Sequence, residues 1–337
     1  RTKAANGYPT LNIIESDGKD DGVIECRQLA LDNKVVGFLA MGGGSTMDIV
    51  KAASLLVNVD LPEGAKSLVN YFVGHYNGPD LPRHAGLISI PTTAGTGAEA
   101  TRSCIIASSA LGVKATLSSQ AAKADWVLLD PEMTKDLPPY FTAITGMDAI
   151  AHACEALCCT RSNIYTEMIC GKSLELSWKN LPIVYKEPHN MEARANMSLA
   201  AYLALTGESY GNCGHSMAHA IGADFHVPHG HCCAWTAPVA LYYTRNDCDH
   251  EIRLIARSFG LDDKSPTVAK DVANAMKQLV WSLGIKTPAE MGIKREDFIA
   301  SAPKVMVDPI HLCCHTPLTE DKARELLGEV YDQKLYE

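Results

Sequence analysis

The chain has 337 residues, which is enough for two domains or for one domain with an enlarged lobe. Its formal net charge is −9, 47% of its residues are hydrophobic and 20% are charged. The acidic balance and the lack of a basic run argue against a nucleic-acid partner. No apolar run reaches the length of a membrane span, so we expect no membrane segment. The composition is that of an ordinary globular protein.

The twelve cysteines are not spaced as a metal-binding or redox motif. No pair has the Cys-x-x-Cys spacing, and adjacent cysteines such as Cys232 and Cys233 cannot easily form a bridge with each other. We therefore expect reduced, buried thiols, which indicate a reducing compartment and a cytoplasmic location.

The first third of the chain alternates strand-like and helix-like segments. Buried strands are expected at 35–41, 87–90 and 126–129, because each is a short apolar run that ends in Gly or Pro signals. A helix is expected at 46–58, where apolar residues share one face. Strands separated by helices predict a parallel, doubly wound sheet.

Beyond Leu137-Pro138-Pro139 the strand signals fade, and the chain is expected to be all-helical or nearly so. The segments with helical periodicity are 143–158, 166–180, 191–205, 214–223, 268–283 and 320–331. The sequence thus predicts an α/β domain over 1–137 and a helical domain over 138–337.

Two glycine-rich stretches follow two of the expected strands. Gly42-Gly43-Gly44-Ser45 lies between a strand and a helix, where free backbone N–H groups attract phosphate. The alternative for this stretch alone is a tight turn with Ser45 as the helix N-cap. The second stretch, at 91–99, offers hydroxyl groups at the same expected sheet edge. Ligands bind at this edge of open α/β sheets, so the two loops together favour a bound dinucleotide.

The helical half contains a dense group of possible metal ligands. Asp148 and His152 are four residues apart in an expected helix, so they share one face, although such a pair is often only a structural contact. Five of the twelve histidines fall between His215 and His231. We expect Gly222 to end the helix that carries His215, and the following turn to bring His229 back beside His215. Imidazole and carboxylate donors together suit Fe(II), Zn(II) or Mn(II).

These stretches resemble the iron-containing (group III) alcohol dehydrogenase family. The matching motifs occur in the family's order: GGGSTMD at 42–48, PTTAGTGAEAT at 91–101, DPEMTKDLP at 130–138, GMDAIAHACEA at 146–156 and HSMAHAIGADFHVPHG at 215–230. The resemblance implies an N-terminal dinucleotide-binding domain, 1–137, followed by a metal- and substrate-binding domain, 138–337. Family members carry several dozen residues before the segment that matches Tyr8-Pro9-Thr10, so we expect this sequence to lack the first elements of the sheet.

The resemblance also implies roles for individual residues. The four metal ligands match Asp148, His152, His215 and His229. The histidine beside the metal and the nicotinamide matches His219, a candidate proton carrier. The cofactor-binding positions match Gly43, Gly44, Ser45, Asp48, Thr92, Thr93, Thr96 and Lys114.

We therefore expect a metal-dependent, NAD(P)-linked alcohol dehydrogenase or aldehyde reductase that acts on a small primary alcohol or aldehyde. Fe²⁺ is the expected metal, with Zn²⁺ or Mn²⁺ as alternatives, and NAD and NADP both stay open. The resemblance further implies a homo-oligomer, a dimer or larger. Two other functions are open: a metal-dependent lyase or cyclase of the same fold, similar to dehydroquinate synthase, and a non-catalytic relative. The fourth ligand position, His152, favours the dehydrogenase branch, because the other branches use one carboxylate and two histidines.

Overall fold

The computed structural model describes residues 18–206 and 211–337. The chain divides into two compact units. The first comprises Arg1–Thr93 and Ala98–Met133, and the second comprises Ala94–Gly97 and Thr134–Glu337. The domain boundary expected near Leu137 stays a prediction, and the structural division falls after Met133.

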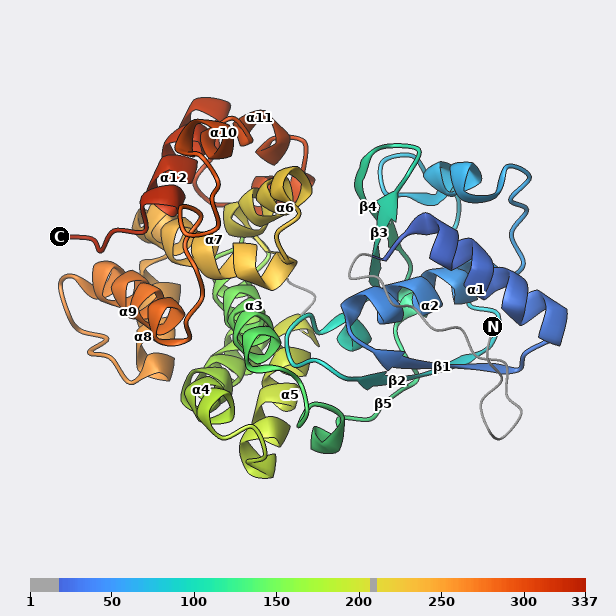
Figure 1. Ribbon diagram of the computed structural model, residues 1–337, viewed down its shortest axis with the longest axis horizontal. Helices are drawn as coiled ribbons and strands as arrows, with labels where there is room; N and C mark the ends of the chain where they lie inside the picture. The colour runs from blue at the N-terminus through green and yellow to red at the C-terminus, as the bar shows by residue number, and fades with distance from the viewer. Residues whose placement is uncertain (1–17, 207–210) are drawn as a thin grey trace. The chain divides into compact units, whose positions relative to one another are not determined.

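The first unit is an α/β unit (Figure 1). Its helices and strands are α1 (Asp20–Asn33), β1 (Gly37–Gly42), α2 (Gly44–Leu56), β2 (Gly86–Pro91), β3 (Ser103–Ser108), β4 (Val113–Ser118) and β5 (Trp126–Val127). Its short 3₁₀ helices are Gly64–Tyr71, Ala98–Ala100, Gln120–Ala122 and Pro131–Met133.

The sheet of this unit is parallel, as predicted, in the order β1-β2-β5. Leu39 pairs with Ile88, and Ile88 pairs with Trp126. Residues of α1 and α2 pack with Ala40 of β1 and Leu87 of β2 in one buried cluster. Helix α2 therefore starts at the carboxyl end of β1 and runs back along the sheet, as a parallel β-α-β connection requires.

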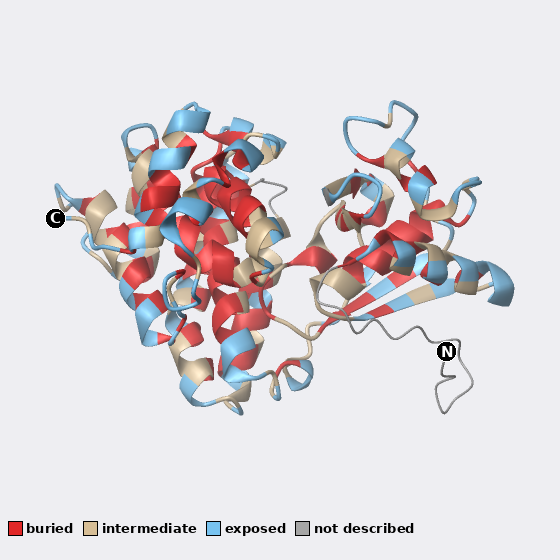
Figure 2. Cartoon of the chain, turned by 45° about the horizontal axis from the view of Figure 1, so that its top comes forward, coloured by how far each residue is buried: buried red, intermediate tan, exposed pale blue. Residues whose placement is uncertain are grey.

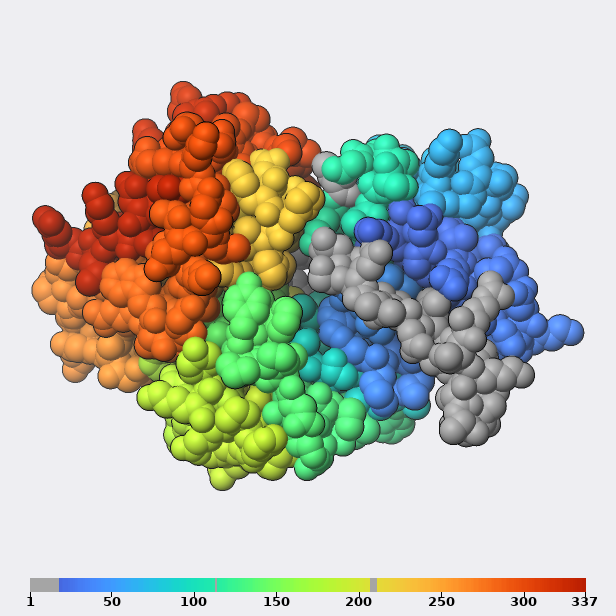
Figure 3. All heavy atoms as spheres, in the orientation of Figure 1, coloured from blue at the N-terminus to red at the C-terminus, as the bar shows by residue number. Residues whose placement is uncertain are grey.

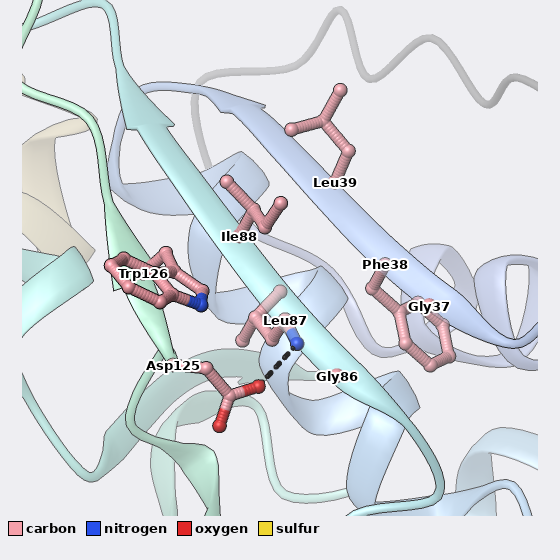
Figure 4. Close-up of a pocket in the computed structure, with 8 residues that line it drawn as sticks. All are labelled: Gly37, Phe38, Leu39, Gly86, Leu87, Ile88, Asp125 and Trp126. Carbon is pink, nitrogen blue, oxygen red and sulfur yellow. Dashed lines mark hydrogen bonds between the residues drawn. The ribbon is translucent and has the colours of Figure 1, made fainter.

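In the described part of the chain, one face of these strands is exposed. The paired side chains Leu39, Ile88 and Trp126 are 58%, 42% and 73% exposed. Figure 4 shows these side chains in a shallow hollow on the strands, where the Asp125 carboxylate accepts a hydrogen bond from the Leu87 amide at 2.8 Å. Within the described part of the chain, the core of this unit forms where α1 and α2 lie, and these three apolar side chains point away from it.

The sequence did not reveal an antiparallel hairpin in the first unit. Strands β3 and β4 pair from Ser103 with Ser118 to Ser108 with Val113. Along β3 the residues alternate between buried and half-buried, the period of a strand with one covered face. Helix α1 was also missed, because its face toward the core consists of only a few apolar residues, such as Val23, Cys26 and Ala30.

The second unit is helical, as predicted (Figure 1). Its helices are α3 (Pro139–Leu157), α4 (Ile164–Lys186), α5 (Met191–Thr206), α6 (Cys213–Phe225), α7 (His229–Tyr243), α8 (Asp249–Phe259), α9 (Val268–Ser282), α10 (Arg295–Ile299), α11 (Ala302–Val305) and α12 (Glu320–Asp332). Two 3₁₀ helices are Thr244–Asn246 and Pro309–Cys313, the latter labelled η6. Figure 2 shows buried residues gathered at the centre of this unit, where α3 and α7 contribute most of their length to one core. None of the described helices is long and apolar enough to cross a membrane.

Helix α6 ends later than predicted. It continues through Gly222 to Phe225, and His226 takes the left-handed conformation that ends it, with φ 54°. A side chain at position 222 would place its Cβ 3.3 Å from the carbonyl oxygen of Val227, so the glycine allows the α6–α7 turn to approach the helix. In Figure 3 the yellow residues of α6 lie beside orange-red residues near the end of the chain, in agreement with the packing of α6 against α11 and η6.

All twelve cysteines lie in the described ranges, and all are free and buried. The reduced state of these thiols stays a prediction. Buried thiols of this kind behave as small apolar side chains in the core.

Candidate metal centre

Three helices of the second unit bring four possible ligands together. Asp148 and His152 come from α3, His215 comes from α6, and His229 is the first residue of α7. One ligand atom of each residue lies within 4.8 Å of the others. Asp148 Oδ1 is 3.5 Å from His152 Nδ1, 3.7 Å from His215 Nε2 and 3.5 Å from His229 Nε2. These separations are what donors around one first-row metal ion require.

Close contact between α3 and α7 sets this geometry. A Cβ on Gly230 would lie 2.3 Å from the carbonyl oxygen of Ile144, so only glycine allows the start of α7 to touch the α3 backbone. Pro228 is the N-cap of α7 and fixes the direction in which the helix begins. His229 is thereby held opposite Asp148, with its ring centroid 5.4 Å from that of His215.

The polar atoms of this cluster fit a bound cation. Asp148 Oδ1 and His152 Nδ1 are buried and have no hydrogen-bond partner. Unsatisfied buried polar atoms are costly, and a cation would compensate for both. Burial lowers the pKa of His152 to about 4, which keeps its ring neutral and able to donate a lone pair. Burial alone would raise the pKa of Asp148, but His152 and His229 outweigh it and hold this pKa below its usual range.

A buried carboxylate that the sequence did not single out supports His215. Glu155 Oε1 lies 2.9 Å from His215 Nδ1, and Glu155 Oε2 accepts hydrogen bonds from the backbone amides of Asn212 and His215 at 2.6 and 3.1 Å. A hydrogen on Nδ1 that faces Glu155 leaves the Nε2 lone pair of His215 for the metal. Helical spacing could have identified Glu155, since it lies three residues after His152 and seven after Asp148 on α3.

A thiol also adjoins the cluster. Cys233 lies one turn after His229 on α7, with its Sγ 3.4 Å from His229 Nε2 and 3.7 Å from His215 Nε2. Burial raises the pKa of Cys233 to about 12, so in this environment it is a neutral side chain. It is fully buried beside these two imidazoles.

His219, the expected proton carrier, lies beside the four-residue cluster. Its ring stacks on that of His229, with centroids 5.0 Å apart and planes at 27°. Its Nδ1 lies 2.5 Å from Oδ2 of Asp308, a second carboxylate that the sequence did not single out. Since Asp308 is 89 residues away in the chain, no local spacing could have revealed this pair. His311 is buried, with Nδ1 2.5 Å from the carbonyl oxygen of Asp308.

Five of the expected cofactor residues lie where β1 and β2 end. Gly43 is the N-cap of α2, so Ser45 is not the cap, and Gly44 and Ser45 open the helix. Thr92 donates its backbone amide to the carbonyl oxygen of Gly42 at 2.9 Å, and a Cβ on Gly43 would lie 3.3 Å from the Thr93 side chain. The two loops therefore adjoin each other at the carboxyl edge of the sheet, beside a helix N-terminus that favours anions.

The other three expected cofactor residues lie elsewhere. Asp48 is buried, with Oδ1 3.2 Å from Lys51 Nζ and Oδ2 accepting the Ile105 amide at 3.0 Å. Burial raises the pKa of Asp48 despite this ion pair. Lys114 is exposed on β4, and its charge acts to lower the same pKa. Thr96 belongs to the second unit, in the segment Ala94–Gly97.

Two sequence profiles of known families match the chain. The profile described as iron-containing alcohol dehydrogenase matches residues 3–131, and that of the Fe-containing alcohol dehydrogenase family, C-terminal, matches residues 142–331. The chain is 34% identical over 291 residues to the probable alcohol dehydrogenase EutG of Salmonella typhimurium, covering 85% of this chain and 69% of the relative. It is also 34% identical over 281 residues to the sulfoacetaldehyde reductase of Bilophila wadsworthia, covering 80% of this chain and 69% of that relative.

Solved structures give the same result. An alcohol dehydrogenase from Oenococcus oeni matches with a TM-score of 0.87 at 28% identity, over 95% of this chain and 83% of that one. The sulfoacetaldehyde reductase of Bifidobacterium kashiwanohense, solved in complex with NAD⁺, matches with a TM-score of 0.80 at 27% identity, over 94% of this chain and 81% of that one. With the fold, both profiles and these relatives in agreement, the chain belongs to the iron-containing alcohol dehydrogenase family.

Proposed function

We propose that this chain is a metal-dependent, nicotinamide-linked oxidoreductase that interconverts small primary alcohols and aldehydes. The observation that carries the proposal is the cluster of Asp148, His152, His215 and His229, with its buried, unpartnered carboxylate oxygen. The donor set combines one carboxylate with three imidazoles, which suits Fe²⁺ and also accommodates Zn²⁺ or Mn²⁺. The names of the relatives, alcohol dehydrogenases and sulfoacetaldehyde reductases, support a small alcohol or aldehyde as substrate.

The four residues would hold the divalent cation, which supplies Lewis acidity toward a hydroxyl or carbonyl oxygen. Glu155 keeps the His215 ring in the orientation and tautomer that a ligand needs. His219 is the group beside the cluster that can accept the hydroxyl proton and pass it to solvent, because its side chain is 22% exposed.

In the first unit, the residues at the ends of β1 and β2 would hold the dinucleotide, NAD or NADP, whose nicotinamide exchanges the hydride. We propose that backbone N–H groups of Gly43, Gly44 and Ser45 bind its pyrophosphate, with Thr92 and Thr93 beside them; the position of these three residues at the start of α2 supports this role. Roles for Asp48, Thr96 and Lys114 are proposed on the family resemblance.

We also propose a cytoplasmic, homo-oligomeric enzyme. The twelve free thiols support a reducing compartment. The family resemblance supports assembly, and light scattering on the purified protein measures the number of subunits.

The first test loads the purified protein with Fe(II) or Zn(II) without oxygen and supplies NADH or NADPH with a panel of short aldehydes. Cofactor oxidation should match aldehyde loss one to one. Asp148→Ala and His229→Ala should lower both metal content and turnover below detection, because each removes a donor. The matched control is His250→Ala, since His250 is an exposed histidine outside the site, 3.6 Å from Glu167; it should keep metal and activity.

Full activity after a chelator has removed the metal would contradict the metal-dependent mechanism. Turnover of substrate with no net change in NADH would support a lyase or cyclase instead. Bound metal without any turnover on the aldehyde panel would favour a non-catalytic relative.

A further inference from the structure

The hydrogen bonds of Asp308 indicate a role that differs from that of the four proposed metal ligands. Its carboxylate Oδ2 lies 2.5 Å from His219 Nδ1, with both side chains mostly buried. A carboxylate at neutral pH has no hydrogen to donate, so the ring nitrogen must carry the hydrogen of this bond. The Nε2 of a neutral His219 is then the nitrogen with the free lone pair.

The other carboxylate oxygen of Asp308, Oδ1, has its own partner, which prevents the carboxylate from rotating away from His219. Asp308 is the N-cap of η6, and its Oδ1 accepts the backbone amide of Ile310 at 3.0 Å. η6 in turn packs against α6, the helix that carries His219. Each oxygen of the carboxylate thus has a fixed partner, and the direction of Oδ2 toward His219 follows from the cap.

The ring of His219 is bounded by two proposed ligands. It stacks on His229, and its centroid lies 6.2 Å from that of His215 in an edge-on arrangement. Stacking limits how far the ring can tilt, and the bond to Asp308 limits its rotation. The ring is therefore held in one orientation beside the cluster of donors.

We propose that Asp308 is a positioning residue that keeps the hydrogen of His219 on Nδ1, so that Nε2 can receive the substrate's hydroxyl proton. This inference rests on the proposed function. In the alcohol-oxidising direction the substrate carbon loses a hydride to the oxidised nicotinamide, and the hydroxyl proton goes to Nε2. The resulting imidazolium is stabilised by the Asp308 carboxylate, and the proton then leaves to solvent.

The discriminating variant is Asp308→Asn. The asparagine oxygen can still accept the Ile310 amide, but the NH₂ group then faces His219 Nδ1 and forces that nitrogen to accept. The hydrogen of the ring moves to Nε2, which loses its lone pair. If the amide turns around instead, its NH₂ group meets the Ile310 N–H, and the cap is lost. Asp308→Glu keeps a carboxylate acceptor and should keep the tautomer.

The tautomer is read by ¹⁵N NMR of the histidine rings in the Zn(II)-loaded protein, with His219→Gln to assign the signal. We expect the hydrogen on Nδ1 in the wild type and in Asp308→Glu, and on Nε2 in Asp308→Asn. Steady-state kinetics should show kcat about 100-fold lower in Asp308→Asn, with KM and metal content close to wild type and a partial recovery in Asp308→Glu.

The matched control is Asp224→Asn. Asp224 is a carboxylate on α6, the helix that carries His219, and it accepts hydrogen bonds from Ser301 and Lys304 rather than contacting His219. It should leave the His219 tautomer unchanged. If Asp308→Asn does not fold, Asp308→Ser is the second variant: serine can still cap η6 but leaves Nδ1 without a fixed acceptor, so the ring hydrogen should no longer be held on Nδ1 alone.

Two results would overturn the inference: a hydrogen that stays on Nδ1 in Asp308→Asn, or a changed tautomer with wild-type kcat. A wild type that turns over no aldehyde refutes the proposed function, whereas the NMR result still decides whether Asp308 positions His219.

Discussion

Glu155 contacts His215 at two points: its Oε1 lies 2.9 Å from Nδ1 of the ring, and its Oε2 accepts the backbone amide of His215. Replacing Glu155 with Gln keeps an oxygen for the backbone amides but turns an NH₂ group toward His215 Nδ1. The ring would then carry its hydrogen on Nε2, the nitrogen that the metal needs. We expect metal affinity to fall about 10- to 100-fold, measured by competition with a zinc-binding fluorescent chelator.

The control for this prediction is Glu167→Gln, which removes a carboxylate near a histidine outside the site. It should leave metal affinity unchanged. A wild-type dissociation constant for Glu155→Gln would mean that the tautomer of His215 does not depend on Glu155.

At the scale of single residues, the sequence predicts the metal-ligating residues better than it predicts the side chains that contact them. Asp148 and His152 can be placed on one face because helical spacing is local, and the structure places their donor atoms 3.5 Å apart. Asp308 contacts His219 only through the tertiary fold, across 89 residues. Asp48 was expected to face the cofactor, but its carboxylate is paired with Lys51 in the interior of its unit. Its role in cofactor binding stays a prediction.

At the scale of elements, one added methyl group, in Gly230→Ala, tests whether the metal site needs the close contact between α3 and α7. In Gly230→Ala the new Cβ would meet the carbonyl oxygen of Ile144 at 2.3 Å, so α7 must move away from α3. Forced overpacking of this kind costs about 1–3 kcal/mol. We expect lower stability in urea unfolding of the metal-free protein, and sub-stoichiometric metal, because His229 moves with α7.

Gly171→Ala is the matched control. Gly171 lies inside α4, and a Cβ there meets nothing within 4 Å. Alanine in place of a helical glycine should stabilise the protein by about 0.5–1 kcal/mol and leave metal content unchanged. Equal metal content in both variants would show that the start of α7 does not need its close contact with α3.

The elements that the sequence predicts well are those with a strong local pattern. The helix carrying Asp148 and the strands around Leu39 and Ile88 were predicted within a few residues of their bounds. The hairpin β3–β4 was missed because its pairing is a relation between two segments rather than a property of either one. Helix α7 was missed because Pro238 and Gly230 argue against a helix, yet the core of the unit buries most of this segment.

At the scale of the whole molecule, the two proposed ligands, metal and dinucleotide, are assigned to different units. Each unit has its own hydrophobic core, and all four proposed metal ligands lie in the unit that contains Thr134–Glu337. A ligand present at 100 times its dissociation constant stabilises the state that binds it by about 2.7 kcal/mol.

Hydrogen exchange read peptide by peptide can therefore separate the two sites. Zn(II) should slow exchange in α3, α6 and α7 by up to about 100-fold, because opening these helices releases the metal, and should leave α1 and the hairpin β3–β4 unchanged. NAD or NADP should slow exchange at 42–48 and at Thr92 and Thr93, since backbone N–H groups at a helix N-terminus are the proposed pyrophosphate donors. Asp148→Ala should abolish the effect of zinc while keeping that of the dinucleotide. Protection of α1 and α3 to the same extent by zinc would contradict the assignment, because it would mean that metal binding stabilises both units as one.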